Sequence, residues 1–253
     1  MAGKLKIMKL IQEHRTIRKY TTEPIPADLL KKIFEAGCRA STTGNMQVYS
    51  IVNTTSAELK KRLSPTHFNQ PMVMNAPNVV TFCADFNRFN QWCTLNNAVP
   101  GYNNFLSFIT AAIDALLVAQ NVVVAAESAG LGICYLGTTL YNAAEIISIL
   151  NLPKGVVPVT TLTIGWPDED PIQADRLPLE AILHHETYFD YNDKQLKEFY
   201  RMKENLPANV QFVKENNKAS LAQVFTDIRY KQADNEYFSA KLYEVLKQQG
   251  FLE

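Results

Sequence analysis

The chain has 253 residues, of which 47% are apolar and 20% are charged, and its formal net charge is zero. This length suits one large domain with an extension better than two independent domains. A neutral chain lacks the basic surplus that neutralising nucleic-acid phosphates requires, so we expect no nucleic-acid partner.

The longest apolar stretch, residues 111–137, is interrupted by Asp114, Gln120 and Glu127 and therefore predicts a buried helix, not a membrane span. The opening MAGKLKIMKL alternates lysine with apolar residues and therefore lacks the continuous apolar stretch that is typical of a secretion signal. We therefore expect a cytoplasmic protein without a membrane partner. The four cysteines form no CxxC pair and no metal-ligand spacing, which predicts reduced thiols and no metal site.

Hydrophobic periodicity predicts the core in chain order. Helices are expected over 5–14 and 26–40, with Pro26 in the first turn of the second. Next come a polar loop (41–45), a strand (47–53), a helix capped by Ser56 (56–63), a buried strand (78–86), a loop (96–104), a long apolar helix (105–130), a strand (132–137), a helix (142–151), a strand with threonines alternating on one face (156–167) and an extended loop (168–178).

Charged helical segments follow at 193–205, 221–232 and 238–250. They have too few apolar residues for a core of their own. We therefore expect a core of residues 1–190 and a helical extension of residues 191–253 that packs on the core or on a partner subunit. Strands and helices mixed around one central helix indicate an α+β fold with a mixed or antiparallel sheet.

Several common sites are missing from the sequence. Gly130, Gly132 and Gly137 end a helix and run through a strand, which is the wrong context for a dinucleotide fingerprint. Phosphate-loop, GxSxG and HExxH motifs are absent, and the His184–His185 pair is typical of surface or packing residues. Without a nucleophile or an acid–base pair, the chemistry is expected to belong to a cofactor.

Three polar groups in the sequence are candidates for binding such a cofactor. The stretch HRTIRKY at 14–20 gathers basic residues that suit a bound anion, and Arg176, isolated in a loop, can join them in a phosphate clamp. The loop ASTTGNMQVY at 40–49 either caps itself or presents amide and hydroxyl groups to a heteroaromatic edge. Asn69 and Gln70 add two more amides.

These stretches resemble the flavin-dependent nitroreductases, in particular the larger oxygen-insensitive NADPH nitroreductase and flavin reductase branch. HRTIRKYTTEPIP is similar to the family's opening signature, and ASTTGNMQVYSIV is similar to its second polar loop. QNVVVAAESAGLGICYLG, NLPKGVVPVTTLTIGWP and DRLP follow in the family order. The resemblance covers roughly residues 8–188.

The resemblance implies an intertwined homodimer with FMN at the interface, and NADPH or NADH as the co-substrate in two-electron, ping-pong reduction of nitroaromatics, quinones or flavins. It also implies that the backbone N–H of Gly137 approaches flavin N5, that Gln70 binds the pyrimidine edge and that the 41–45 loop comes from the second subunit. The implied cofactor-binding residues are His14, Arg15, Thr16, Arg18, Ser41, Thr42, Thr43, Asn45, Gln70, Tyr135, Leu136, Gly137, Thr138 and Arg176.

Two positions depart from the family pattern. Ala174 stands where a lysine is frequent in the family, so one phosphate contact is expected to be missing. Thr138 replaces the second glycine of a pair, and its side chain is expected to narrow the space over the ring. Reductive dehalogenation or flavin fragmentation, a non-catalytic flavin-binding protein and a flavin-free nicotinamide dehydrogenase remain alternatives.

Overall fold

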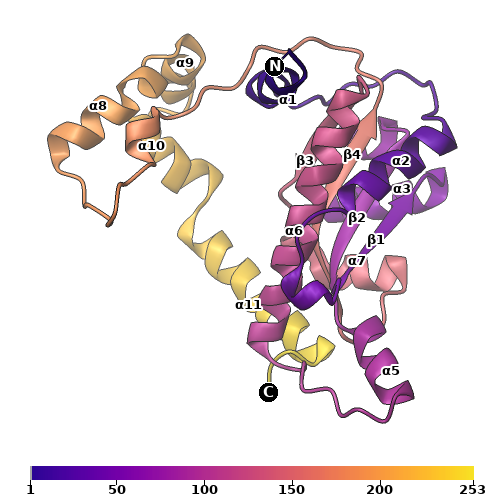
Figure 1. Cartoon of the computed structure of the whole chain (residues 1–253). Coiled ribbons are helices and arrows are strands. Elements are labelled where there is room, and N and C mark those ends of the chain that lie inside the picture. The colour runs from indigo at the N-terminus through magenta and orange to yellow at the C-terminus, as the bar shows by residue number, and fades with distance from the viewer. Residues whose placement is uncertain (1) are drawn as a thin grey trace. The chain divides into compact units, whose positions relative to one another are not determined.

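The computed structural model describes residues 2–253, which form two compact units. The first unit consists of the described residues up to Gln173 together with Phe238–Glu253. The second unit consists of Ala174–Tyr237. The first unit contains the sheet and the hydrophobic core, whereas the second is helical (Figure 1).

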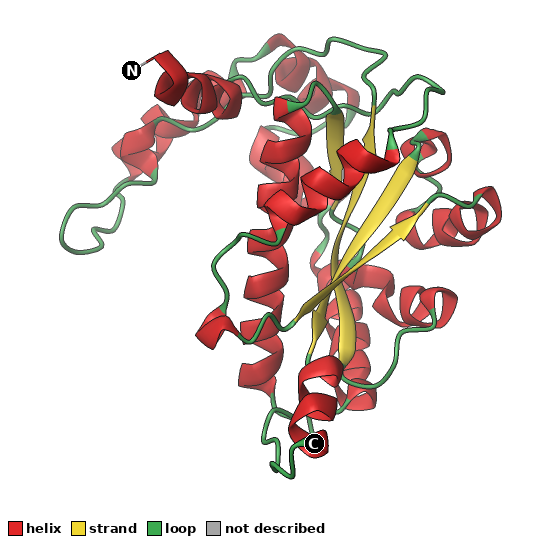
Figure 2. Ribbon diagram, turned by 45° about the vertical axis from the view of Figure 1, so that its right-hand side comes forward, coloured by secondary structure: helices red, strands yellow, loops and turns green. Residues whose placement is uncertain are grey.

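One antiparallel sheet of four strands forms the centre of the first unit, in the order β1-β2-β4-β3. This arrangement confirms the expected α+β class. The strands are β1 (Tyr49–Thr54), β2 (Asn78–Asp85), β3 (Gly132–Leu136) and β4 (Val156–Gly165). Every residue of β2 and β4 is buried, because helices cover both faces of the sheet (Figure 2).

The threonines of β4 differ from the expected pattern of one threonine face. Thr161 and Thr163 point to one face, but Thr160 is adjacent to Thr161 and therefore points to the other. All three are buried. The hydroxyls of Thr161 and Thr163 form hydrogen bonds inside the protein. Thr161 bonds the Thr139 hydroxyl at 3.0 Å, and Thr163 bonds the Tyr20 hydroxyl at 2.8 Å. The strand is therefore a central strand and not a half-exposed one.

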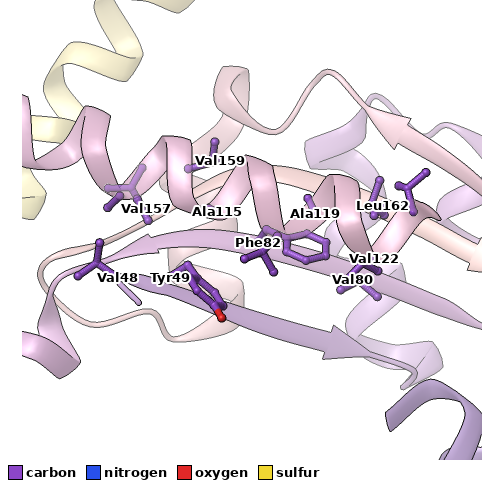
Figure 3. Packing of buried hydrophobic residues seen from close by; sticks show 14 of the residues in the cluster. Val48, Tyr49, Val80, Phe82, Ala115, Ala119, Val122, Val157, Val159 and Leu162 are labelled. Carbon is purple, nitrogen blue, oxygen red and sulfur yellow. The ribbon is translucent and has the colours of Figure 1, made fainter. Parts of the chain in front are cut away.

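The long helix α6 (Phe105–Ser128) packs its small residues against the sheet. Ala115, Ala119 and Val122 lie over Val80 and Phe82 of β2, and alanine side chains let the helix approach the strands closely (Figure 3). The helix α2 (Ala27–Gly37) in turn packs on α6, since a Cβ at Gly37 would lie 2.3 Å from Val122 Cγ2. By length and apolar composition α6 meets the criterion for a membrane span, but here it is the central core helix.

The other helices and turns of the first unit are short. The expected helices at residues 5–14, 56–63 and 142–151 are present, and Ser56 caps its helix by accepting from Leu59 N. Pro26 is the residue before α2 and not within its first turn. The elements are α1 (Ala2–Gln12), α3 (Ala57–Leu63), α4 (Pro71–Asn75), α5 (Asn87–Leu95), α7 (Ala143–Leu150) and the 3₁₀ turns η1 (Thr43–Asn45), η2 (Ser64–His67) and η3 (Leu140–Asn142).

The second unit has a small core of its own, in which Leu221 and Val224 are buried. An ion pair between Lys203 and Asp175, at 2.8 Å, ties its helices to the segment that enters it. Its elements are η4 (Leu179–Ala181), α8 (Asp193–Glu204), α9 (Pro207–Glu215), α10 (Leu221–Val224) and a π turn, η5 (Phe225–Arg229).

The last helix, α11 (Gln232–Gln249), begins in the second unit and ends in the first. Its final turns bury Val245 and Leu246 in the main core, and Phe251 contacts Phe108 with ring centroids 5.7 Å apart. The end of the chain is therefore part of the core of the first unit.

Candidate functional site

The basic stretch at 14–20 runs beside β3. Thr16 forms a parallel bridge with Ile133, and Ile17 N–H donates to Ile133 O at 2.9 Å. A Cβ on Gly132 would lie 2.6 Å from Ile17, so only glycine permits this approach. The buried Tyr20 closes the stretch by donating its hydroxyl to Ile17 O at 2.6 Å, and burial raises its pKa.

His14, at the start of the stretch, is oriented by the end of α6. Its Nδ1 lies 2.5 Å from Oε1 of Glu127, and both side chains are half-buried. The Gln173 amide donates to the backbone oxygens of Gln12 and His14, at 2.5 and 3.3 Å. A carboxylate partner fixes the ring orientation of a histidine, so His14 presents a defined edge.

Acidic residues of the 168–170 loop hold the backbone of the same stretch. Oε1 of Glu169 accepts from the backbone N–H groups of Arg18 and Lys19, at 2.5 and 3.0 Å, and these bonds lower the pKa of Glu169. The Arg15 guanidinium lies 3.8 Å from Asp170, whose side chain is almost fully exposed. The backbone is therefore fixed, while the Arg15 charge has only a loose, solvent-exposed partner.

Tyr135, Leu136 and Gly137 follow soon after Ile133, the residue of β3 that pairs with the basic stretch. Leu136 is buried, and Tyr135 OH contacts Gln120 at 3.3 Å, with burial raising the pKa of Tyr135 to about 12. Gly137 is exposed, and a Cβ built on it would meet no atom within 4 Å. A flat ligand can therefore approach the backbone at Gly137.

Thr138 contacts a histidine that the sequence did not single out. Its Oγ1 lies 2.8 Å from Nδ1 of His67, at the end of η2. His67 is fully buried, and burial lowers its pKa to about 4, so its ring is neutral at pH 7. The hydroxyl of Thr138 is thus bonded toward η2, and the expectation that its side chain narrows the space over a ring stays a prediction.

Gln70 follows His67 after two residues in left-handed conformation. Phe68 and Asn69 both have φ of 54°, which asparagine tolerates better than most residues. Gln70 N–H then donates to His67 O at 3.2 Å, and Gln70 precedes the first turn of α4. The sharp turn leaves Gln70 half-buried, on the same segment as the partner of Thr138.

The polar loop at 41–47 is held by the middle of α6. Asp114, which is buried, accepts from the backbone N–H and the hydroxyl of Thr43, at 3.0 and 3.3 Å. Asn45 and Gln47 both have φ of 56°, and the Arg88 guanidinium donates to Gln47 O and, at 3.1 Å, to Tyr49 O. Ser41 and Thr42 precede this anchored turn.

The two anchors of α6 separate this loop from the basic stretch. Asp114 and Glu127 are 13 residues apart, 127 minus 114, which at about 1.5 Å per residue is roughly 20 Å along the helix. His14 is tied to one anchor and Thr43 to the other. Within one chain, these two groups of predicted residues are therefore attached far apart.

Arg176 and the histidine pair belong to the second unit. The Arg176 guanidinium donates to the backbone oxygens of Asp175 and Ala174, at 2.9 and 3.4 Å, and its convergence with Arg15 stays a prediction. His184 packs on Tyr188, with ring centroids 4.3 Å apart, and contacts Tyr191 OH at 2.9 Å. His184 thus has the packing role that its sequence context indicated.

Glu127, Asp114 and His67 are the partners that sequence reasoning did not identify. Each contacts a residue far away in the chain, so no local spacing marks them. The only sequence signal was a charged or polar residue inside an apolar stretch, as for Asp114 and Glu127. Those residues were interpreted only as interruptions of a membrane span.

The assembled residues suit an anionic, heteroaromatic ligand. Arg15 directly precedes Thr16, which bridges to Ile133 of β3, and its guanidinium is partly exposed. Four residues after Ile133 the chain reaches Gly137, which faces open space. Gln70, which offers both an amide donor and an acceptor, lies on the segment bonded to Thr138. This donor set fits a flavin with a terminal phosphate.

Several known proteins are similar to this chain in sequence and in fold. A sequence model of the Nitroreductase family matches residues 11–166. An FMN reductase [NAD(P)H] of Bacillus subtilis is 34% identical over 210 residues, which are 79% of this chain and 84% of that protein. An oxygen-insensitive NADPH nitroreductase of Salmonella typhimurium is 34% identical over 200 residues, with coverage of 76% and 82%.

A crystal structure from Bacteroides fragilis superimposes with a TM-score of 0.96 at 54% identity, covering 97% of this chain and all of that one. The resemblance of the basic stretch and the polar loop is therefore accompanied by agreement over the whole fold. The chain belongs to the Nitroreductase family.

Proposed function

We propose that this protein is an FMN-dependent NAD(P)H oxidoreductase that reduces nitroaromatics, quinones or flavins. One observation carries the proposal: the basic stretch is fixed beside β3, and β3 is followed directly by Gly137, which faces open space. A phosphate and a flat ring on one ligand fit these two features together. The names of two relatives, an FMN reductase and an NADPH nitroreductase, support the same cofactor and co-substrate.

Each group has a role in binding. Arg15, Arg18 and the Glu127-oriented His14 hold the phosphate, with Thr16 beside them and Arg176 as a further cation. Gln70 binds the pyrimidine edge, while the backbone at Tyr135 and Leu136 runs beside the ring, since the Leu136 side chain is buried. Arginine suits a phosphate because its planar fork donates two parallel hydrogen bonds.

When bound, FMN would supply two-electron redox chemistry: it would be reduced in the half-reaction with NAD(P)H and reoxidised in the half-reaction with a second substrate that occupies the same space. The chain contributes geometry and charge. The N–H of Gly137 donates where negative charge increases on reduction, and fixed donors of this kind stabilise the charged form without reorganising. No side chain is required as a strong acid or base, since solvent supplies protons.

The binding site is proposed to be shared between two copies of the chain. Thr43 is bonded to Asp114, which lies roughly 20 Å along α6 from Glu127, the partner of His14. We therefore assign the loop with Ser41, Thr42, Thr43 and Asn45 to the ring that the partner subunit binds. On α6, one side exposes a continuous apolar strip that suits a partner helix. This α6 strip consists of Phe105, Leu106, Ile109, Ile113, Leu116 and Leu117, which are 36 to 73% exposed.

The remaining parts of the proposal concern location and domain roles. The FMN-binding core is assigned to residues 1–190 and the extension to residues 191–253, although the last turns of α11 pack in the core of the first unit and the second compact unit begins at Ala174. The protein acts in the cytoplasm, where NAD(P)H is available and its four free thiols stay reduced.

The test is an absorption spectrum of the purified protein followed by anaerobic titration with NADPH and with NADH in parallel. A flavin spectrum that bleaches on addition of one equivalent of coenzyme, and returns with a nitroaromatic or quinone, is the expected result. A colourless protein that binds no added FMN would refute the proposal. Bound FMN that neither coenzyme reduces would leave only a flavin-binding protein.

A further inference from the structure

Two segments that lie far apart in the chain are joined beside the proposed ring site. The segment 64–70 carries Gln70, and the turn 136–142 carries Gly137. His67 Nδ1 contacts Thr138 Oγ1 at 2.8 Å, and the Asn142 amide donates to Thr66 O at 2.7 Å. The two groups assigned to opposite parts of one ring are therefore connected through a few bonds.

His67 has a single polar side-chain contact in the described part of the chain. Its ring is fully buried, and Nε2 has no hydrogen-bond partner among residues 2–253. A buried N–H without an acceptor is rarer than an unused acceptor, which assigns the proton to Nδ1. The ring then donates to Thr138 Oγ1, and the contact with Thr138 is the one directional interaction of this side chain.

The turn after β3 does not need His67 in order to form. Thr139 Oγ1 donates to Leu136 O at 3.0 Å, and Tyr141 N–H donates to Thr138 O at 3.1 Å. Thr139 also bonds Thr161 of β4 at 3.0 Å. These bonds shape the turn and attach it to the sheet. Two bonds then join the turn to the 64–70 segment: the Asn142–Thr66 bond at its far end and the His67–Thr138 bond at the residue next to Gly137, which therefore acts on the position of Gly137 most directly.

We propose that His67 and Thr138 are positioning residues, whose hydrogen bond sets the spacing between the Gly137 N–H and the Gln70 amide at the flavin ring. The inference rests on the proposed function. Neither residue is assigned to the reacting atoms; both act through the segments that carry Gly137 and Gln70. Threonine at position 138 thus has a partner in this chain, where the family pattern has glycine.

A misplaced N–H at Gly137 is expected to affect the reduced ring most, because the extra negative charge appears only on reduction. Thr138→Val keeps the shape of the side chain and removes its hydroxyl. This variant is expected to lose about tenfold of the preference of the protein for reduced over oxidised FMN. For a two-electron couple, this loss lowers the midpoint potential of bound FMN by about 30 mV.

The experiment measures two quantities for each variant: the dissociation constant of oxidised FMN, by fluorescence titration of apoprotein, and the midpoint potential of bound FMN, by equilibration with a reference dye. Thr138→Ser keeps the hydroxyl and is expected to restore the potential of the unaltered protein. Thr94→Val is the matched control, since within residues 2–253 the Thr94 hydroxyl bonds only Asn90 O of its own helix, at 3.0 Å. Thr138→Ala provides a second variant without a hydroxyl should Thr138→Val not fold.

The two proposals fail in distinguishable ways. If the unaltered protein binds no FMN, the proposed function and this inference are both overturned. If it binds FMN and oxidises NAD(P)H, but the variants without a hydroxyl at position 138 keep its potential, only the positioning role is overturned. A change in urea stability without a change in potential likewise overturns it, because a merely structural bond predicts that result.

Discussion

The burial of His67 predicts how the folding free energy of the protein changes as the pH is lowered. The pKa of His67 is lowered to about 4 in the folded protein, against an ordinary 6.5, because the charged ring would lose its hydration on burial. The unfolded chain therefore binds a proton between these two values while the folded chain does not. Folding stability from this group is complete above pH 6.5 and is lost as the pH falls toward 4.

The magnitude follows from the size of the pKa difference. One pKa unit corresponds to about 1.4 kcal/mol, so His67 costs about 2 kcal/mol of folding free energy at pH 5 and about 3 kcal/mol at pH 4. A loss of that size is a large share of a typical domain stability of roughly 5–15 kcal/mol. Aspartate and glutamate residues add their own changes, but those changes are the same in a protein that differs only at His67.

The assay is urea unfolding at pH 7 and pH 5 for the unaltered protein and for His67→Gln, which carries no titratable group. His67→Gln is expected to be less stable at pH 7, since it repacks a buried site. Between pH 7 and pH 5, however, it should lose about 2 kcal/mol less than the unaltered protein. Equal losses in the two proteins would refute the reasoning, because they would mean that His67 titrates alike in the folded and unfolded states.

Three further predictions concern the proposed site and interface. Arg15→Ala should weaken FMN binding by about 1.5–3 kcal/mol, the usual contribution of a charged hydrogen bond, and a parent-like dissociation constant by fluorescence titration would contradict the phosphate assignment. Asp170→Asn should tighten FMN binding by up to about fivefold at low salt, because it removes the exposed competitor at 3.8 Å from Arg15; unchanged binding would mean that this carboxylate does not compete. Ile113→Glu should give a monomer in light scattering, because it places a charge on the half-exposed α6 strip, and an unchanged dimer would exclude that strip as the interface.

The main elements of the fold were predictable because they have strong local signals. Strands β1 and β2 and the helix α6 follow from apolar runs of the right length, and Ser56 marks the start of α3. The short helices α4, α5 and α9 were missed, because their few turns give no clear period and depend on packing. The threonines of β4 were assigned to one face because the sequence does not reveal that both faces of this strand are covered.

The site was predictable only in part, for a different reason. The chemical character of the 14–20 stretch and the 41–47 loop is visible in the sequence, since cations and amides have few roles when gathered together. Their anchors are not visible: Glu127 and Asp114 act on residues 113 and 71 positions away. The role of His67 depends on a fold that brings η2 beside the turn after β3, and a lone histidine has no local pattern that reveals such a neighbour.

Asp114 and Glu127 lie on one uninterrupted helix, so α6 fixes both the distance and the rotation between the residue that anchors Thr43 and the residue that orients His14. Each added residue turns an α-helix by about 100°, so one insertion between these two residues would swing Glu127 away from His14 while leaving Asp114 at Thr43. Length changes are therefore expected to be tolerated much less in this half of α6 than in the 96–104 loop before it, although Tyr102 of that loop packs against the same core.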